Sequence, residues 1–238
     1  MINEQTISEL VSWLKDSVNN AGAKGIVFGL SGGIDSAVLA GISKLAFPNT
    51  TLGIIMPSHS NPNDEVDGLS VAECFEIKTE KVDLTSVYDT LIDSSFDSSN
   101  DMAKSNIKPR LRMTTLYYYA QSNNYLVCSG SNKSEFYLGY FTKHGDSGTD
   151  LLPLIDFTKS EIYELARLLK VPAQIIEKPP SAGLWEGQTD EDEMGFSYKV
   201  LEDYFDGREV PEKIRNKIEN MHRISEHKRN YPNAYKRI

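Results

Sequence analysis

Apolar residues along this chain recur in two patterns, short continuous runs and helical spacings. Runs typical of buried strands are followed by apolar residues spaced three and four apart, which is typical of helices. The strands predicted in this way lie at 26–30, 51–56, 76–82, 125–129 and 151–155. The predicted helices include 36–46, 64–75, 84–93 and 106–122, with one before residue 22 and others after residues 158 and 211. This alternation favours an α/β fold, a doubly wound, Rossmann-like parallel sheet of about five strands flanked by helices.

Length and composition suit one domain covering residues 1–238. Hydrophobic residues make up 39% and charged residues 25% of the chain, as in ordinary globular proteins. The first residues lack the basic and apolar regions of a signal peptide, and no apolar stretch approaches the ~20 residues of a membrane span. We therefore expect a cytoplasmic protein that is not bound to a membrane, in which the isolated Cys74 and Cys128 are buried thiols.

The net charge is −9, which argues against a nucleic-acid binder that works through a broad basic face. The charge is uneven, because residues 212–238 are rich in Lys and Arg and residues 186–209 are rich in Asp and Glu. An acidic protein that binds polyphosphates must concentrate cations locally, so the basic positions are the informative ones.

The segment Ser31-Gly-Gly-Ile-Asp-Ser36 joins the first strand to its helix. Such a turn directs free backbone N–H groups and the positive end of a helix at an anion. Its glycines allow close approach to a ligand, the two serines add hydroxyl donors, and Asp35 can hold Mg²⁺ between phosphate oxygens. No lysine is present, so this is not the Gly-x-x-x-x-Gly-Lys-Ser/Thr loop. The plainer interpretation is a strand–turn–helix with a Ser N-cap.

The loop resembles that of the ATP pyrophosphatases, Ser-Gly-Gly-x-Asp-Ser, which cleave ATP between the α and β phosphates. The fourth strand ends at Gly130-Ser-Asn-Lys-Ser-Glu135. Ligands of parallel sheets sit beyond the carboxyl ends of the strands, so we expect these two strand ends to face one crevice. We expect the polar, glycine-punctuated stretch 139–150 to form a lid, and residues 94–101 and 178–196 to form surface loops, the acids at 190–193 being solvated.

Motifs along most of the chain together resemble ammonia-dependent NAD synthetases. They are Ser31–Ser36, Asn106-Ile-Lys-Pro-Arg-Leu-Arg-Met113, Asn132-Lys-Ser-Glu135, Gly139-Tyr-Phe-Thr-Lys-His-Gly-Asp146, Asp150-Leu-Leu-Pro153, Lys178-Pro-Pro-Ser-Ala182, Gly187-Gln-Thr-Asp-Glu191 and Glu226-His-Lys-Arg229. The resemblance implies an adenine nucleotide alpha hydrolase-like fold. It also implies amidation of nicotinic acid adenine dinucleotide (deamido-NAD) by ammonia, with Mg-ATP consumed and NAD, AMP and pyrophosphate formed.

The resemblance also assigns residues to each ligand. Asp35 and Glu135 match the Mg²⁺ ligands. The positions that match ATP contacts are Gly29, Leu30, Ser31, Gly32, Gly33, Ile34, Asp35, Ser36, Gly130, Lys159 and Ser181. Those that match deamido-NAD contacts are Arg110, Lys143, Asp150, His227 and Lys228. Gly130 departs from the family, which often has Thr there, and Ser129 or Ser131 could supply the missing hydroxyl.

The chemistry of the reaction explains why these residue types are needed. The acceptor carboxylate attacks the α-phosphate, so two anions must approach each other, and Mg²⁺ and a lysine offset their charge. We expect catalytic roles for Lys159 and Asp35. Asp146 or Asp150 is the candidate for binding ammonium or accepting its proton.

Two alternatives remain at this stage. Another adenylating enzyme with the same loop, GMP-synthetase-like or tRNA-modifying, is opposed by the acidic charge and by the lack of an RNA-binding appendage. A non-catalytic ATP-binding sensor is opposed by the presence of Asp35, Glu135 and Lys159 together. The resemblance further implies a homodimer that uses free ammonia or ammonia from a separate protein, since no glutaminase region is seen.

Overall fold

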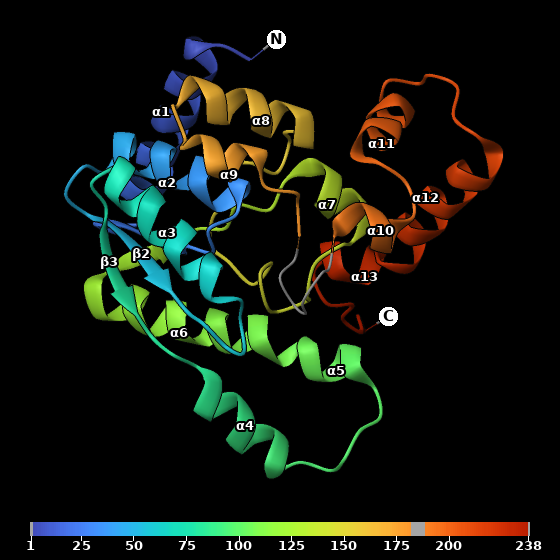
Figure 1. Cartoon of the computed structure of the whole chain (residues 1–238), viewed down its shortest axis with the longest axis horizontal. Coiled ribbons are helices and arrows are strands. Elements are labelled where there is room, and N and C mark those ends of the chain that lie inside the picture. Colours follow the sequence, from blue (N-terminus) through green and yellow to red (C-terminus); the bar gives the residue numbers. More distant parts are fainter. Residues whose placement is uncertain (1, 182–188, 238) are drawn as a thin grey trace.

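A four-stranded parallel sheet forms the centre of the protein (Figure 1). The computed structural model describes residues 2–181 and 189–237. Strands lie at β1 (Gly25–Gly29), β2 (Thr51–Ile55), β3 (Lys78–Lys81) and β4 (Tyr125–Val127). Their order across the sheet is β3-β2-β1-β4, and every neighbouring pair is parallel. The predicted α/β class and parallel sheet are therefore confirmed.

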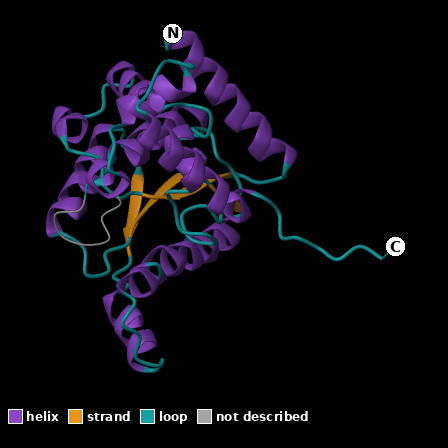
Figure 2. Ribbon diagram, turned by 90° about the vertical axis from the view of Figure 1, so that its right-hand side faces the viewer, coloured by secondary structure: helices purple, strands orange, loops and turns teal. Residues whose placement is uncertain are grey.

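Helices cover both faces of the sheet, as the edge-on view shows (Figure 2). In the first half of the chain they are α1 (Glu4–Asn20), α2 (Ile34–Ala46), α3 (Pro62–Cys74), α4 (Thr85–Asp93), α5 (Asp101–Ser105) and α6 (Ile107–Asn123). In the second half they are α7 (Lys133–Leu138), α8 (Lys159–Leu168), α9 (Ala173–Glu177), α10 (Asp190–Met194), α11 (Tyr198–Phe205), α12 (Glu212–Ile224) and α13 (Glu226–Arg229).

Alternation of side chains along β1 explains the two layers. Ile26 and Phe28 point to one face and pack in the cluster formed by α1, α2 and α8. Val27 points to the other face and packs with Met113 and Leu116 of α6. All three β1 side chains are fully buried, so the strand needs apolar residues at consecutive positions, and it reads as a continuous apolar run.

A third apolar cluster lies beside the sheet and is built by α7, α10, α11 and α12 (right of Figure 1). Leu138 of α7, Leu201 of α11 and Ile218 of α12 are at its centre and are almost fully buried. Of these helices, the sequence patterns predicted α12 and the start of α7. The helix α7 joins this cluster to the sheet, because it follows β4 directly.

The predicted fifth strand is absent from the part of the chain that the structure describes. Leu151 makes only an isolated parallel bridge with Cys128. The following residues turn, with the N–H of Ile155 donating to the carbonyl of Leu152, and Pro153 has no N–H to offer a ladder. The apolar run at 151–155 was a wrong strand prediction, because Leu154 is buried from within a turn rather than from a strand.

Other local predictions are settled by the same structure. Thr158 and Glu161 form the expected capping box of α8. The expected surface loop at 178–196 is wrong in part, because α10 lies within it; residues 182–188 lie outside the described residues. Cys128 is buried as expected, whereas Cys74 is exposed at the end of α3.

The strand order places the switch point of the sheet between β1 and β4. The chain moves from β1 to β2 and β3 on one side and then returns to β4 on the other. The loops after β1 and β4 therefore leave the sheet at the same edge and lie next to each other, which is where α/β proteins bind ligands. This confirms the shared edge expected from the sequence.

Two features concern the outside of the molecule. None of the helices among residues 2–181 and 189–237 is both long and apolar enough to cross a membrane.

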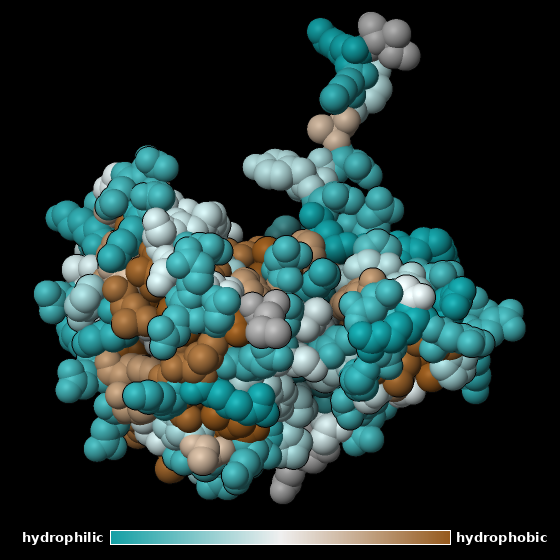
Figure 3. Space-filling view, turned by 90° about the horizontal axis from the view of Figure 1, so that it is seen from above, coloured by the Kyte–Doolittle hydropathy of each residue, from teal (hydrophilic) through white to brown (hydrophobic). Residues whose placement is uncertain are grey.

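The C-terminal residues extend away from the body, as the space-filling view shows (Figure 3), and Tyr231 and Tyr235 are almost fully exposed.

The helix α2 offers a matched test of the core. Leu39 is buried between the sheet and its flanking helices, and Leu45 on the same helix is half exposed. We expect Leu39→Ala to lower the free energy of unfolding by about 2–5 kcal/mol, because it leaves a cavity. Leu45→Ala is expected to cost less than about 1 kcal/mol, since no buried cavity forms. Urea unfolding of both variants checks this, and equal losses would contradict the packing described.

Candidate functional site

The loop after β1 carries a cradle of backbone groups at the start of α2. Gly33 is the N-cap of α2 and has no side chain with which to cap it, so the Ser N-cap of the plainer interpretation is not formed. The hydroxyl of Ser36 instead donates to the carbonyl of Gly33 at 2.8 Å, and it accepts from the N–H of Ser31 at 3.3 Å. The positive end of this 13-residue helix is thus left for a ligand.

Gly32 is needed where this loop meets α3. Its φ is +76°, and a Cβ there would lie 2.6 Å from the carbonyl oxygen of Asp64 and 2.7 Å from Cβ of Asp67. A side chain would therefore be strained and would also overlap α3. The first turns of α3 form one wall of the phosphate-binding loop predicted from the sequence.

Lys159 lies at the centre of the site and brings three elements together. Its Nζ is 2.5 Å from Oδ2 of Asp35 on α2 and 3.3 Å from Oε1 of Glu135 on α7. Lys159 begins α8, and its side chain is only 3% exposed. The structure thus brings together three residues that lie far apart in the sequence and that were predicted as one set.

Burial and charge together set the protonation of this cluster. Burial opposes the charge on Lys159, but Asp35 and Glu135 outweigh it and raise the pKa of the lysine, which stays protonated. Burial and the carboxylate of Asp35 raise the pKa of Glu135 to about 8, and Lys159 offsets this in part. The lysine is therefore the counter-ion of Asp35 and a hydrogen-bond donor to Glu135.

Further residues around Lys159 were missed by the sequence analysis. The amide of Asn132 donates to Oδ1 of Asp35 at 2.8 Å, and its oxygen accepts from the N–H of Glu135 at 3.0 Å. The ring of Tyr198 lies 5.4 Å from Nζ of Lys159, and its hydroxyl donates to Asp190 at 2.7 Å. The Asn132-Lys-Ser-Glu135 motif contained the signal for the first of these, because Asn is a preferred N-cap.

The acids at 190–193 were expected to be solvated, and for Asp190 this is wrong. Its side chain is buried, and burial raises its pKa. Tyr198 partners it, while the carboxylates of Glu191 and Glu193 accept from the N–H of Tyr198 and the hydroxyl of Tyr140. Acidic composition predicted a solvated segment, and residues 191–193 are exposed as expected, but a tertiary hydrogen bond draws Asp190 into the third cluster.

Asp35 and Glu135 fit a magnesium ion by their chemistry. Mg²⁺ prefers oxygen ligands and is usually held by one or two carboxylates together with substrate phosphates. Both carboxylates converge on one cation, Lys159, beside the phosphate loop. Among the residues described, no group of three or more His, Cys, Asp or Glu side chains could hold a metal by itself.

The residues predicted to hold the acceptor form a second group. Nε of Arg110 donates to the carbonyl of Lys143 at 3.2 Å. Nζ of Lys143 donates to the carbonyl of His227 at 2.7 Å and is 3.5 Å from its Nδ1. Lys228 donates to the carbonyls of Gly139 and Phe141, and burial lowers its pKa. The stretch after α7 and helix α13 thus lie side by side and concentrate cations, as an anionic ligand requires.

Asp146 and Asp150 have different surroundings. Oδ1 of Asp146 accepts from the N–H of Thr142 at 2.9 Å, and burial raises the pKa of this carboxyl. Asp150 accepts from the N–H of Val127 and from the hydroxyl of Tyr117, both at 2.8 Å. Asp150 therefore accepts from two protein donors at the end of β4, whereas Asp146 is a buried carboxyl whose pKa is raised.

Gly130 and Ser181 complete the predicted ATP set. A Cβ on Gly130 would lie 3.1 Å from the backbone carbonyl of Asp35, so a threonine here would require a small shift of the loop. The neighbouring hydroxyls of Ser129 and Ser131 are 3.3 Å apart, and Ser131 is buried. Ser181 is exposed and directly precedes residues 182–188.

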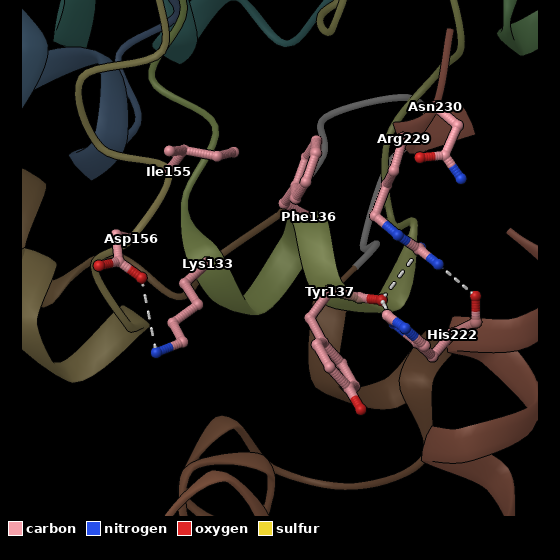
Figure 4. A pocket seen from close by; sticks show the side chains of 8 residues that line it. All are labelled: Lys133, Phe136, Tyr137, Ile155, Asp156, His222, Arg229 and Asn230. Carbon is pink, nitrogen blue, oxygen red and sulfur yellow. Dashed lines mark hydrogen bonds and ion pairs between the residues drawn. The ribbon is translucent and has the colours of Figure 1, made fainter. Parts of the chain in front are cut away.

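A separate hollow of about 540 Å³ lies on another side of α7 (Figure 4). It is lined by Lys133, Phe136, Tyr137, Ile155, Asp156, His222, Arg229 and Asn230. The ring of His222 stacks on Tyr137 with the centroids 4.0 Å apart, and the guanidinium of Arg229 donates to the carbonyl of Tyr137. None of these residues belongs to the predicted ATP or acceptor sets, so this hollow is not the site described above.

Comparisons with known proteins agree with this arrangement. The sequence model of the NAD synthase family matches residues 6–232. The NH(3)-dependent NAD(+) synthetase of Finegoldia magna is 54% identical over 227 residues, which are 95% of this chain and 94% of that protein. The corresponding synthetase of Carboxydothermus hydrogenoformans is 48% identical and covers 96% of each chain.

Solved structures show the same fold. An NMN synthetase from Francisella tularensis superposes with a TM-score of 0.95 at 41% identity, over 99% of both chains. An NH3-dependent NAD synthetase from Campylobacter jejuni gives a TM-score of 0.85 at 29% identity, over 99% of this chain and 100% of that one. With its phosphate loop, its buried lysine and these relatives, the chain belongs to the NAD synthase family.

Proposed function

We propose that the protein is a ligase that amidates deamido-NAD with ammonia to form NAD, with ATP converted to AMP and pyrophosphate. The observation that carries the proposal is Lys159, held by Asp35 and Glu135 beside a loop suited to phosphates. Relatives named NH(3)-dependent NAD(+) synthetases, one of them 54% identical, support the choice of substrate. We further propose that residues 1–238 act as one domain.

The residues of the chain have distinct tasks in this reaction. The loop from Gly29 to Ser36 binds the ATP phosphates, and Gly130 and Ser181 complete the nucleotide site. The acceptor carboxylate attacks the α-phosphorus and pyrophosphate leaves, which gives an adenylated carboxylate. Lys159 stabilises the negative charge that develops on the phosphate oxygens in this step. Mg²⁺, when held by Asp35 and Glu135, supplies further compensation for phosphate charge.

The second step is attack by ammonia on the adenylated carboxyl carbon, from which AMP leaves. Arg110, Lys143, His227 and Lys228 hold the acceptor through its phosphates, and Asp150 is assigned to the same ligand. Asp146 takes up the proton that the attacking nitrogen loses, a role that its burial favours by raising its pKa. Ammonia is a small neutral molecule, so it needs no large binding site.

A second acceptor has a specific observation in its favour. The structure that superposes with a TM-score of 0.95 is named an NMN synthetase. The product named there is a mononucleotide, so nicotinic acid mononucleotide is the alternative acceptor. The amidation chemistry is the same for both, and only the part of the site that holds the second nucleotide half differs.

One assay decides among these functions. We mix the purified protein with Mg-ATP and ammonium chloride at mildly alkaline pH, supply either acceptor, and separate NAD, NMN and AMP by chromatography. Equal amounts of NAD and AMP from the dinucleotide support the proposal. NMN and AMP from the mononucleotide alone would replace it with the alternative. AMP with neither product would indicate a different adenylating enzyme, such as a GMP-synthetase-like or tRNA-modifying one. Binding of ATP without AMP formation would indicate a sensor.

Substitutions should separate the two chemical steps. We expect Lys159→Met to lower kcat/KM for ATP by about 10²–10³, because charge on the transferring phosphate loses its partner. Asp146→Asn keeps the oxygen that accepts from Thr142, and we expect it to raise KM for ammonium while KM for ATP stays unchanged. Steady-state rates below each variant's melting temperature check this.

Lys133→Met is the matched control, because Lys133 pairs with Asp156 at the separate hollow. Equal losses in the Lys133 and Lys159 variants would contradict the role of Lys159. An unchanged ammonium dependence in Asp146→Asn would remove Asp146 from the second step.

We also propose that the protein is a homodimer that joins through α4 and α6. Val87 and Leu91 of α4, Tyr118 of α6 and Phe96 in the segment between α4 and α5 expose large apolar side chains to solvent. Apolar surface of this extent on neighbouring elements favours contact with a second copy of the chain. The cytoplasmic location expected from the sequence stays a prediction.

The dimer can be tested on a single side chain. We expect Leu91→Asp to shift the protein from dimer to monomer in sedimentation velocity, because a charge would be buried in the contact. Val66→Asp on α3 is the control, since Val66 is equally apolar and 63% exposed but lies on another helix. A Leu91→Asp variant that remains dimeric would place the interface elsewhere.

A further inference from the structure

Lys178, at the C-terminal end of α9, makes two ion pairs with α3. Its Nζ is 2.8 Å from Oδ1 of Asp64 and 2.7 Å from Oδ2 of Asp67. Burial opposes the charge on Lys178, but the hydrogen bonds to both carboxylates outweigh this and raise its pKa. One ammonium group therefore serves two carboxylates, and the roles assigned above do not use it.

Both acids stand against the phosphate loop. The carbonyl of Asp64 and Cβ of Asp67 are the atoms that a side chain on Gly32 would meet first. The next residue of α3, Gly68, approaches the other end of the loop, where a Cβ would lie 3.2 Å from the carbonyl oxygen of Leu30. Asp67 thus lies where a side chain on Gly32 would be, beside a loop that must hold a polyanion.

Two carboxylates in this position would repel the phosphates of ATP. At separations of several ångströms near a protein surface, each unit charge changes the dissociation constant of a multiply charged ligand several-fold. Lys178 is the cation that pairs with both. Arg112, whose guanidinium donates to the carbonyl of Met56 and the hydroxyl of Ser60, faces Asp64 as well.

Lys178 also marks the point at which the chain leaves α9 for Ser181. Two residues later, the carbonyl of Pro180 accepts from the N–H of Asp190 at 3.1 Å. The ion pairs with α3 therefore hold residue 178, and the backbone hydrogen bond with Asp190 holds Pro180, the residue before Ser181. The same ammonium group both cancels charge and holds this segment beside the loop.

We propose that Lys178 is a positioning residue for ATP, which neutralises Asp64 and Asp67 where α3 packs on the phosphate loop. This rests on the proposed function in one respect, namely that the loop binds ATP. It does not depend on the identity of the acceptor or on ammonia. Lys178 acts through the two aspartates and is not assigned a contact with the phosphates.

The test measures binding of a nucleotide that cannot be cleaved between the α and β phosphates, Mg-α,β-methylene-ATP, by titration calorimetry. We expect Lys178→Gln to weaken binding about tenfold at low salt, and less at high salt, because the lost term is electrostatic. The combination of Lys178→Gln with Asp64→Asn and Asp67→Asn should bind within about threefold of the wild type or more tightly, since the repelling charges are gone. Lys178→Arg should bind like the wild type.

Lys81→Gln is the matched control, because Lys81 pairs with Glu65 of the same helix at 2.6 Å. It should leave the dissociation constant unchanged. If the triple variant binds as weakly as Lys178→Gln while melting like the wild type, charge cancellation is wrong and Lys178 touches the nucleotide or only tethers the segment. A salt-independent loss in Lys178→Gln would overturn the proposal in the same way.

The design separates this proposal from the proposed function. A wild-type protein that binds the analogue but forms no NAD would refute the proposed reaction and leave the Lys178 comparison intact. A wild-type protein that forms NAD, with Lys178→Gln indistinguishable from it in both binding and KM for ATP, would refute the role of Lys178 alone.

Discussion

The ammonium group of Lys159 is the interaction on which the site depends. It is buried, and it is reached by carboxylates from α2 and α7 while its own backbone begins α8. Removal of the lysine or of its carboxylate partners would leave an uncompensated charge where water cannot reach it. The loops after β1 and β4 and the start of α8 therefore have to keep one relative placement. The same requirement explains why Asn132 fixes Asp35 from the other side.

The sequence predicted most of what lies near this lysine. Strands buried on both faces are continuous apolar runs, so β1 and β2 were found within a residue of their bounds. The glycines and Asp35 of the first loop carried the nucleotide prediction, because few residue types fit that turn. The placement of Glu135 and Lys159 came from the family motifs. Their contact with Asp35 follows from the strand order, which puts both loops at one edge.

The failures have physical causes that local patterns do not contain. The run at 151–155 is as apolar as a strand, yet its side chains are buried from a turn. Asp190 looks like a solvated acid among other acids, but its hydrogen-bond partner Tyr198, eight residues later, is buried with it. The third apolar cluster depends on contacts among α7, α10, α11 and α12, which no single segment predicts. In all three cases, contacts between segments distant in the sequence determine the structure.

The segment around Leu151, which was predicted as a fifth strand, covers the free edge of the sheet at β4. Its residues form hydrogen bonds along the free side of β4. The N–H of Val127 donates to the carboxylate of Asp150, and the carbonyl of Val127 accepts from the N–H of Leu151. The N–H of Ser129 donates to the carbonyl of Leu151. An open strand edge is a template on which other chains can assemble. Here that edge is closed by a side chain and a turn, and the opposite edge, β3, carries Lys78 and Lys81. The central sheet thus ends on both sides in groups that discourage another strand from joining it, which leaves helices as the surfaces available for self-association.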